Sequence, residues 1–224
     1  MSELQLNAEP FAFAFTPARA ALVIIDMQRD FLEPGGFGET LGNDVTLLQA
    51  AVEPCRTALD AARANGMLIL HTREGHRPDL ADAPPAKVDR GAPSKRIGDH
   101  GPMGRILIRG EPGHDIIDDL APAQGEPVID KPGKGAFHQT DLMQLLQNRG
   151  IDTLFVCGVT TEVCVHTTIR EGNDRGFRCV ALGDACASYI PEFHRVGLDM
   201  IKAQGGIFGW VSNTSAFAQT LATA

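Results

Sequence analysis

The sequence has few cysteines, no long basic run and no long apolar segment, and each lack excludes a class of protein. Its five cysteines are an odd number without a Cys-x-x-Cys pair, so we expect neither a disulfide framework nor a zinc cage. A net charge of -8 argues against nucleic acid or an anionic membrane surface as the partner. No apolar stretch could span a bilayer, and the amino end lacks the basic region of a signal peptide. We therefore expect a cytoplasmic protein.

Short apolar runs alternate with helical patterns along the chain. Runs typical of buried strands occur at 20–25, 67–71, 127–131, 151–157, 177–182 and 207–211. Helical spacing or helix punctuation occurs at 43–65, 140–149, 165–175, 191–203 and from 213 onward. This alternation predicts an α/β fold in which helices cover both faces of a mainly parallel, doubly wound sheet.

The length of 224 residues suits a single domain, 1–224. We expect residues 1–19 to form an irregular amino-terminal arm. Residues 74–125 are rich in proline and glycine and lack sustained periodicity, apart from one short helix expected around 115–120. A loop of this length inside a compact domain is typical of a lid, a binding loop or an oligomer contact.

Cys164 lies in the first turn of a predicted helix that directly follows a predicted strand. Thr160 or Thr161 is the expected N-cap. The unpaired amides at a helix start carry partial positive charge, so they favour a thiolate and can stabilise an oxyanion. A small, buried and inert cysteine is the other explanation of the same pattern.

Two more reactive side chains end other predicted strands: Asp26 ends the first and Lys131 ends the third. The carboxyl ends of parallel strands share one edge of a sheet, so both should meet Cys164 there. Asp26 would take the thiol proton and later return it to the leaving nitrogen, while Cys164 would attack a carbonyl carbon. Lys131 would hold the carboxylate and favour the developing negative charge. A pair between Cys164 and His166 is a less favoured alternative.

Three segments of the chain resemble the isochorismatase-like cysteine hydrolases. The segments are VIIDMQRDF (Val23 to Phe31), KPxxxAF (Lys131 to Phe137) and GVTTEVCV (Gly158 to Val165). They occur in the family's order, and the resemblance covers nearly the whole chain. The resemblance implies a six-stranded sheet in the order 3-2-1-4-5-6, a dimer or tetramer, and a catalytic triad of Asp26, Lys131 and Cys164. It also implies a cis peptide between Val159 and Thr160, which would turn the Thr160 amide toward an oxyanion hole shared with the Cys164 amide.

Four segments look most like the biuret hydrolase and triuret hydrolase branch, whose members release ammonia from small urea oligomers. They are 71–80, 109–117, 130–137 and 202–209. The likeness implies that Phe31 forms a wall of the pocket and that Lys134 and Gln204 bind the ureido groups of the substrate. Substrates built of alternating C=O and NH₂ groups need such donors and acceptors in a dry pocket. A role in ending a helix is the alternative for Gln204.

We predict no metal and no cofactor. Nicotinamidases, which share the fold, hold a metal through an Asp-x-His pair, whereas the region here offers His71 and His76 without that pair. Two other functions remain open. One is a ureidoacrylate or N-carbamoylsarcosine amidohydrolase, whose substrate carboxylate would bind Arg73, Arg77 or Arg109. The other is a non-catalytic binding or assembly member of the same fold.

Overall fold

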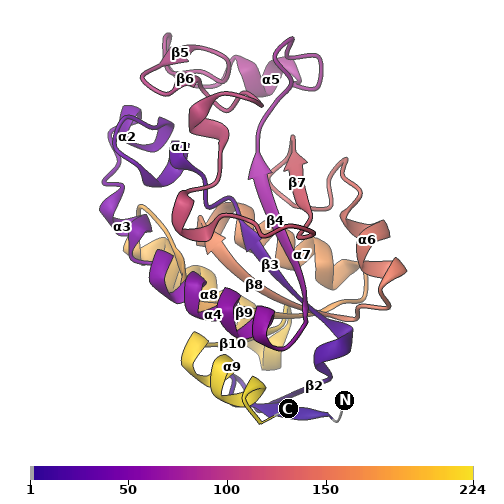
Figure 1. Cartoon of the computed structure of the whole chain (residues 1–224). Helices are drawn as coiled ribbons and strands as arrows, with labels where there is room; N and C mark the ends of the chain where they lie inside the picture. The colour runs from indigo at the N-terminus through magenta and orange to yellow at the C-terminus, as the bar shows by residue number, and fades with distance from the viewer. Residues whose placement is uncertain (1–2, 224) are drawn as a thin grey trace.

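A six-stranded sheet organises residues 3–223, the part of the chain that the computed structural model describes (Figure 1). Its strands are β3 (Ala20–Ile25), β4 (Leu68–Glu74), β7 (Val128–Lys131), β8 (Thr153–Val159), β9 (Arg178–Ala187) and β10 (Trp210–Ser212). All neighbours pair in parallel, in the order β10-β9-β8-β3-β4-β7. When the six strands are numbered 1 to 6 along the chain and read from the β7 edge, the order is 3-2-1-4-5-6, which confirms the predicted topology.

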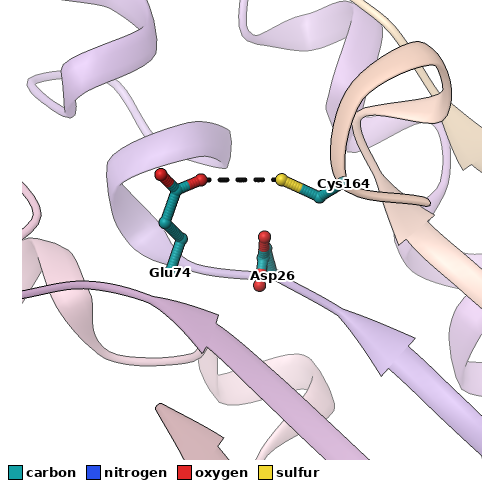
Figure 2. A group of neighbouring side chains, drawn as sticks. All are labelled: Asp26, Glu74 and Cys164. Atoms are coloured by element: carbon teal, nitrogen blue, oxygen red, sulfur yellow. Dashed lines mark hydrogen bonds between the residues drawn. The ribbon is translucent and has the colours of Figure 1, made fainter. Parts of the chain in front are cut away.

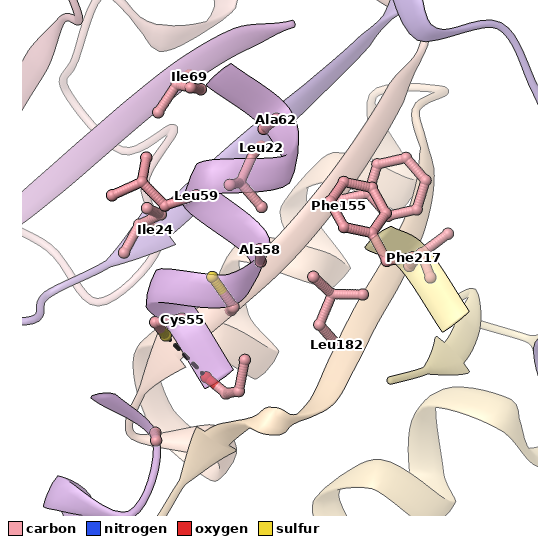
Figure 3. Close-up of a cluster of buried hydrophobic side chains, with 14 of the residues drawn as sticks. Leu22, Ile24, Cys55, Ala58, Leu59, Ala62, Ile69, Phe155, Leu182 and Phe217 are labelled. Carbon is pink, nitrogen blue, oxygen red and sulfur yellow. Dashed lines mark hydrogen bonds between the residues drawn. The ribbon is translucent and has the colours of Figure 1, made fainter. Parts of the chain in front are cut away.

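Helices cover both faces of the sheet because β3 is apolar on both sides. Leu22 and Ile24 point toward one helical layer (Figure 3), and Val23 and Ile25 toward the other. The first layer consists of α4 (Val52–Ala64) and α9 (Thr214–Leu221), and the second of α6 (Leu142–Asn148), α7 (His166–Asp174) and α8 (Pro191–Gly206). Within residues 3–223, none of the helices has the length and apolar character needed to cross a membrane.

The helix expected over 43–65 is divided in two. A short α3 (Thr46–Gln49) precedes α4. Asn43 does not cap either helix; its side-chain amide donates to the Gly38 carbonyl at 3.1 Å. The chain leaves α4 through Gly66, whose φ of +62° suits the glycine expected to end the helix.

The amino-terminal arm is not irregular, contrary to our expectation. It forms an antiparallel ladder of β1 (Leu4–Leu6) and β2 (Phe13–Phe15), followed by the 3-10 turn η1 (Pro17–Arg19). The buried Phe15 ring packs edge-on against Phe155 of β8, with the ring centroids 4.8 Å apart. Each strand has three residues, too few for the alternation of apolar residues to be recognised in the sequence.

The segment between β4 and β7 is largely irregular, as expected; much of it lies beyond the carboxyl ends of the strands, and its last part runs back along the sheet to β7 (Figure 1). It contains α5 (Pro85–Val88), the hairpin of β5 (His100–Gly101) and β6 (Gly104–Arg105), and the 3-10 turns η2 (Pro112–His114) and η3 (Asp118–Leu120). The short helix expected near 115–120 is therefore a single 3-10 turn. Two short helices that follow β3, α1 (Arg29–Leu32) and α2 (Phe37–Thr40), lie at the same end of the molecule.

Phe15→Ala tests whether the arm belongs to the core. Removing this buried ring should lower the free energy of unfolding by about 3–5 kcal/mol, since it leaves a cavity against Phe155. Phe11→Ala is the matched control: Phe11 is 53% exposed, and its loss should cost no more than about 1 kcal/mol. Denaturant unfolding measures both values. Equal, small effects would show that the arm is dispensable.

Candidate active site

Four strands deliver the site's side chains to the carboxyl edge of the sheet. Asp26 follows β3, Glu74 and Lys131 end β4 and β7 as partners in the ladder, and Cys164 follows β8. One carboxylate oxygen of Asp26, one of Glu74 and the Cys164 sulfur all lie within 4.8 Å of one another (Figure 2). The structure therefore brings the three predicted residues together and adds a fourth, Glu74.

A buried ion pair lies at the base of the site. Lys131 Nζ lies 2.7 Å from Asp26 Oδ2, and both side chains are fully buried. The other oxygen of Asp26 accepts a hydrogen bond from the Thr72 hydroxyl at 2.6 Å. Burial opposes the charged form of Lys131, but the attraction of the surrounding negative groups, Asp26 first, outweighs it and raises the lysine pKa. Lys131 is therefore a fixed cation at neutral pH.

Glu74 is a buried carboxylate held between lysines and the thiol. Its Oε1 lies 2.6 Å from Lys134 Nζ and 3.0 Å from Lys87 Nζ. Burial opposes its ionised form, but the ammonium groups of Lys131, Lys134 and Lys87 prevail and lower its pKa to about 2. Its Oε2 accepts a hydrogen bond from the Cys164 thiol, with sulfur and oxygen 3.5 Å apart (Figure 2).

Sequence reasoning missed Glu74 because the predicted strand stopped at His71. The strand β4 continues through three polar residues to Glu74, and a search for apolar runs does not include them. A signal was present nonetheless. A carboxylate close behind a parallel strand is expected at the same edge of the sheet as Asp26.

The surroundings of Cys164 favour the neutral thiol, contrary to the thiolate expected from the helix start. Cys164 is only 4% exposed, and burial disfavours a charged sulfur. Lys131 attracts the thiolate, but Asp26 and Glu74 repel it, and the net effect raises the thiol pKa well above its ordinary value. A base must therefore take the proton before the sulfur can act as a nucleophile.

The turn that carries Cys164 differs in one respect from the expected helix start. The peptide bond between Val159 and Thr160 is cis, which confirms what the family resemblance implied. Thr160 is the N-cap, and its carbonyl accepts a hydrogen bond from the Val165 amide at 3.3 Å. This bond spans five residues, so the first turn is π-helical rather than α-helical.

His166 does not pair with the thiol. Its Nδ1 accepts a hydrogen bond from Arg170 Nε at 3.0 Å, and its ring lies edge-on to Phe208, with the centroids 6.0 Å apart. These contacts engage the imidazole with Arg170 and Phe208, and the hydrogen-bond partner of the thiol is Glu74 instead. The alternative of a cysteine–histidine pair is therefore wrong for this arrangement.

The three predicted substrate contacts are dispersed. Lys134 lies in the site, on Glu74. Phe31 lies in α1, on the segment that follows Asp26, and packs against a small apolar cluster that includes Leu107. Gln204 is exposed and adopts the left-handed conformation (φ +54°) near the end of α8.

Gln204 cannot reach Cys164 within the same chain. The helix α8 begins shortly after the carboxyl end of β9 and returns toward β10, whose first residue, Trp210, pairs with Val180 near the start of β9. Its last turn therefore lies at the amino edge of the sheet, opposite the thiol. Within one protomer, the predicted substrate contact of Gln204 is wrong, and its place at the helix end agrees with the structural alternative.

An open groove of about 780 Å³ lies beside the site. Lys87, Lys134 and Arg90 line it together with the acidic Asp82 and Glu171. Lys87 and Lys134 both contact Glu74, so these two lysines separate the groove from the carboxylate that lies against the thiol. Its size suits a small polar molecule with room for a substituent.

Lysine ammonium groups already neutralise the carboxylates that could bind a metal ion. Asp26, Glu74 and Cys164 offer donor atoms that could in principle bind a metal ion. Each carboxylate, however, already lies against an ammonium group, Lys131 on Asp26 and Lys134 on Glu74. A metal would have to compete with both lysines, so we retain the prediction that the protein needs no metal and no cofactor.

Comparison with known proteins assigns the family. Residues 20–215 match the Isochorismatase domain family. A cysteine hydrolase from Pseudomonas syringae pv. phaseolicola 1448A has 29% identity and a TM-score of 0.80, covering 100% of this chain and 99% of that one. An isochorismatase family protein from Desulfovibrio vulgaris subsp. vulgaris str. Hildenborough has 30% identity and a TM-score of 0.74, covering 91% and 98%. N-carbamoylsarcosine amidase from Thermoplasma acidophilum has the same fold at 23% identity, with a TM-score of 0.67 and coverage of 88% and 96%. The chain therefore belongs to the isochorismatase family.

A thiolate titration tests the protonation state of Cys164. The difference in thiolate ultraviolet absorbance between the wild type and Cys164→Ser isolates this sulfur from the other four cysteines. We expect no thiolate signal at neutral pH and a midpoint above that of an ordinary cysteine, because burial and two carboxylates disfavour the anion. A step with a midpoint below neutrality would contradict this description of the resting site.

Proposed function

We propose that the protein is a cysteine amidohydrolase that cleaves a small ureido amide of the biuret or triuret type and releases ammonia. One observation carries the proposal. The buried sulfur of Cys164, one carboxylate oxygen of Asp26 and one of Glu74 lie within 4.8 Å of one another, and Asp26 also forms an ion pair with Lys131. A nucleophile, a base and a fixed cation are the groups that acyl transfer through a cysteine requires. The groove beside them gives a small polar substrate room to bind.

In the first half-reaction, Asp26 accepts the thiol proton as the sulfur of Cys164 attacks the carbonyl carbon of the substrate. The C=O electron pair moves to oxygen, where the amides of Thr160 and Cys164 and the charge of Lys131 stabilise it. The C=O bond then re-forms, the C–N bond breaks, and Asp26 returns the proton to the leaving nitrogen, which departs as ammonia. Water attacks the resulting thioester, releases the acid product and restores the thiol.

The charge balance of the site supports this chemistry. Three ammonium groups, those of Lys87, Lys131 and Lys134, lie against the carboxylates of Asp26 and Glu74. With the thiol neutral, the cluster carries an excess of one positive charge. That excess favours the negative charge that develops on the substrate oxygen, in a buried setting where electrostatic interactions are strong.

The alternative substrate class is an N-carbamoyl acid or ureidoacrylate. The arginines expected to bind its carboxylate are each paired within the chain: Arg73 with Asp130, Arg77 with Asp79 and Arg109 with Asp82. Arg90, which lines the groove, is the arginine that keeps this alternative open. The fold likeness to N-carbamoylsarcosine amidase is compatible with either class.

We also propose that the protein is a homo-oligomer, a dimer or a tetramer. Gln204 is exposed at the amino edge of the sheet, so it could contribute to a substrate site only in another copy of the chain. Light scattering on the purified protein tests the oligomeric state.

Cys164→Ser tests the covalent mechanism. We expect turnover to fall by about 10³- to 10⁶-fold, with ligand binding and folding retained, because a hydroxyl is a far weaker nucleophile in this setting. Cys179→Ser is the matched control: its sulfur is also buried, lies 3.6 Å from the Ile169 carbonyl and is outside the site, so activity should remain. Near wild-type turnover in Cys164→Ser would overturn the proposal.

A side-by-side assay of ammonia release separates the substrate classes. We expect the highest kcat/KM with biuret or triuret, because the buried site carries no free arginine for a carboxylate. A higher kcat/KM with ureidoacrylate or an N-carbamoyl amino acid would favour the alternative. Binding of these compounds without turnover would favour the non-catalytic member of the fold.

A further inference from the structure

Glu74 is held rigidly and lies against the thiol, in addition to pairing with Lys134 and Lys87. Its backbone is fixed on both sides by the buried Gln28 side chain, whose Oε1 accepts from the Glu74 amide at 2.7 Å and whose Nε2 donates to the Glu74 carbonyl at 3.1 Å. The residue is only 1% exposed. The fold thus holds a second carboxylate in place at the thiol, where Asp26 already provides a base.

The two oxygens of Glu74 have different surroundings. Oε1 is occupied by the ammonium groups of Lys134 and Lys87, at 2.6 and 3.0 Å. Oε2 faces the Cys164 sulfur at 3.5 Å, and the thiol is its hydrogen-bond donor. When the thiol gives up its proton, Oε2 loses that donor. An ionised carboxylate only accepts hydrogen bonds, so it then requires a donor from the substrate.

Ionisation also limits what Glu74 can do as an acid or base. The three nearby lysines keep its pKa at about 2, so it is a weak base and carries no proton to donate at neutral pH. The proposed mechanism already assigns the proton transfers to Asp26, which leaves Glu74 available for another role. What Glu74 offers is a fixed negative charge beside the sulfur that attacks the substrate.

We propose that Glu74 Oε2 accepts a hydrogen bond from the nitrogen that leaves as ammonia, and so makes the site selective for amides over esters. This role rests on the proposed amidohydrolase function and adds a specificity-determining residue to it. As the C–N bond breaks and Asp26 transfers its proton, the nitrogen gains positive character and N–H donors. The contact with an anion then strengthens, and the strengthening lowers the barrier rather than only improving binding. An ester oxygen has no N–H to donate and would instead face the carboxylate with its lone pairs.

Methyl allophanate, an ester analogue of biuret, provides an internal competition. One end of this molecule releases ammonia and the other releases methanol, so the ratio of the two products reports the choice between amide and ester within one enzyme. In Glu74→Gln we expect the ratio of ammonia to methanol to fall about 10- to 100-fold relative to wild type, the effect of losing a hydrogen bond to a charged group. With biuret, the same variant should lose kcat with little change in KM.

The ratio does not depend on how much enzyme remains folded, so a partly unstable variant still gives a result. Glu74→Gln leaves lysines uncompensated and could therefore fail to fold. In that case the double variant Glu74→Gln/Lys87→Met, which removes one cation together with the anion, is used in the assay instead. Lys87→Met alone is the control, and it should leave the ratio unchanged whatever its effect on the rate.

The outcomes separate this inference from the function on which it rests. An unchanged ratio in Glu74→Gln, with both products falling together, would show that Glu74 is a structural counter-ion and would overturn the inference while leaving the cysteine mechanism intact. If the wild type cleaves neither biuret nor methyl allophanate, the ureide proposal fails, and this inference fails with it.

Discussion

The buried ion pair between Asp26 and Lys131 is the constraint on which the rest of the site depends. Both groups are fully buried, and removing one partner of such a pair costs about 3–5 kcal/mol because the other charge is left uncompensated. The fold therefore has to bring the ends of β3 and β7 together across β4. That requirement places Glu74, the ladder partner of Lys131, in the same small volume, and Lys134 and Lys87 then balance its charge.

This arrangement changes how the thiol is understood to work. A thiolate stabilised in advance would also react with oxidants and other electrophiles, whereas a buried thiol between two carboxylates is protonated and unreactive at rest. In the proposed mechanism, its activation requires a substrate carbonyl in place and Asp26 ready to accept the proton. That mechanism couples nucleophile formation to substrate binding, and it uses the excess positive charge of the lysines when the oxyanion forms.

The sequence predicted the sheet and three of the four central residues for a simple physical reason. Asp26, Lys131 and the Cys164 turn each follow an apolar run, and parallel strands must present their carboxyl ends at one edge. Glu74 was missed because β4 ends in polar residues that serve the site instead of the core. The thiolate prediction was wrong because a local helix pattern does not reveal burial or the carboxylates that other strands supply. Gln204 was misplaced because α8 returns to the amino edge, which a motif alone does not show.

The sequence resemblance implied the cis bond before Thr160, but it did not explain the glycine that precedes this bond. Gly158, just ahead of the cis bond, has a φ of +109°, and a Cβ there would lie 2.1 Å from the Ile25 carbonyl oxygen. The glycine is needed because β8 and β3 approach so closely at this point. This close approach becomes visible only when β8 and β3 are paired in the structure, although the glycine itself belongs to the GVTT segment.

The central claim, that Cys164 forms a covalent acyl intermediate inside this charged cluster, is tested most directly by quenching the enzyme with acid during turnover of biuret and analysing its peptides by mass spectrometry. We predict an acyl adduct on the peptide that contains Cys164, present in the wild type and absent from Cys179 and the other cysteines. Turnover without any adduct on Cys164, or an adduct on a different residue, would contradict the account.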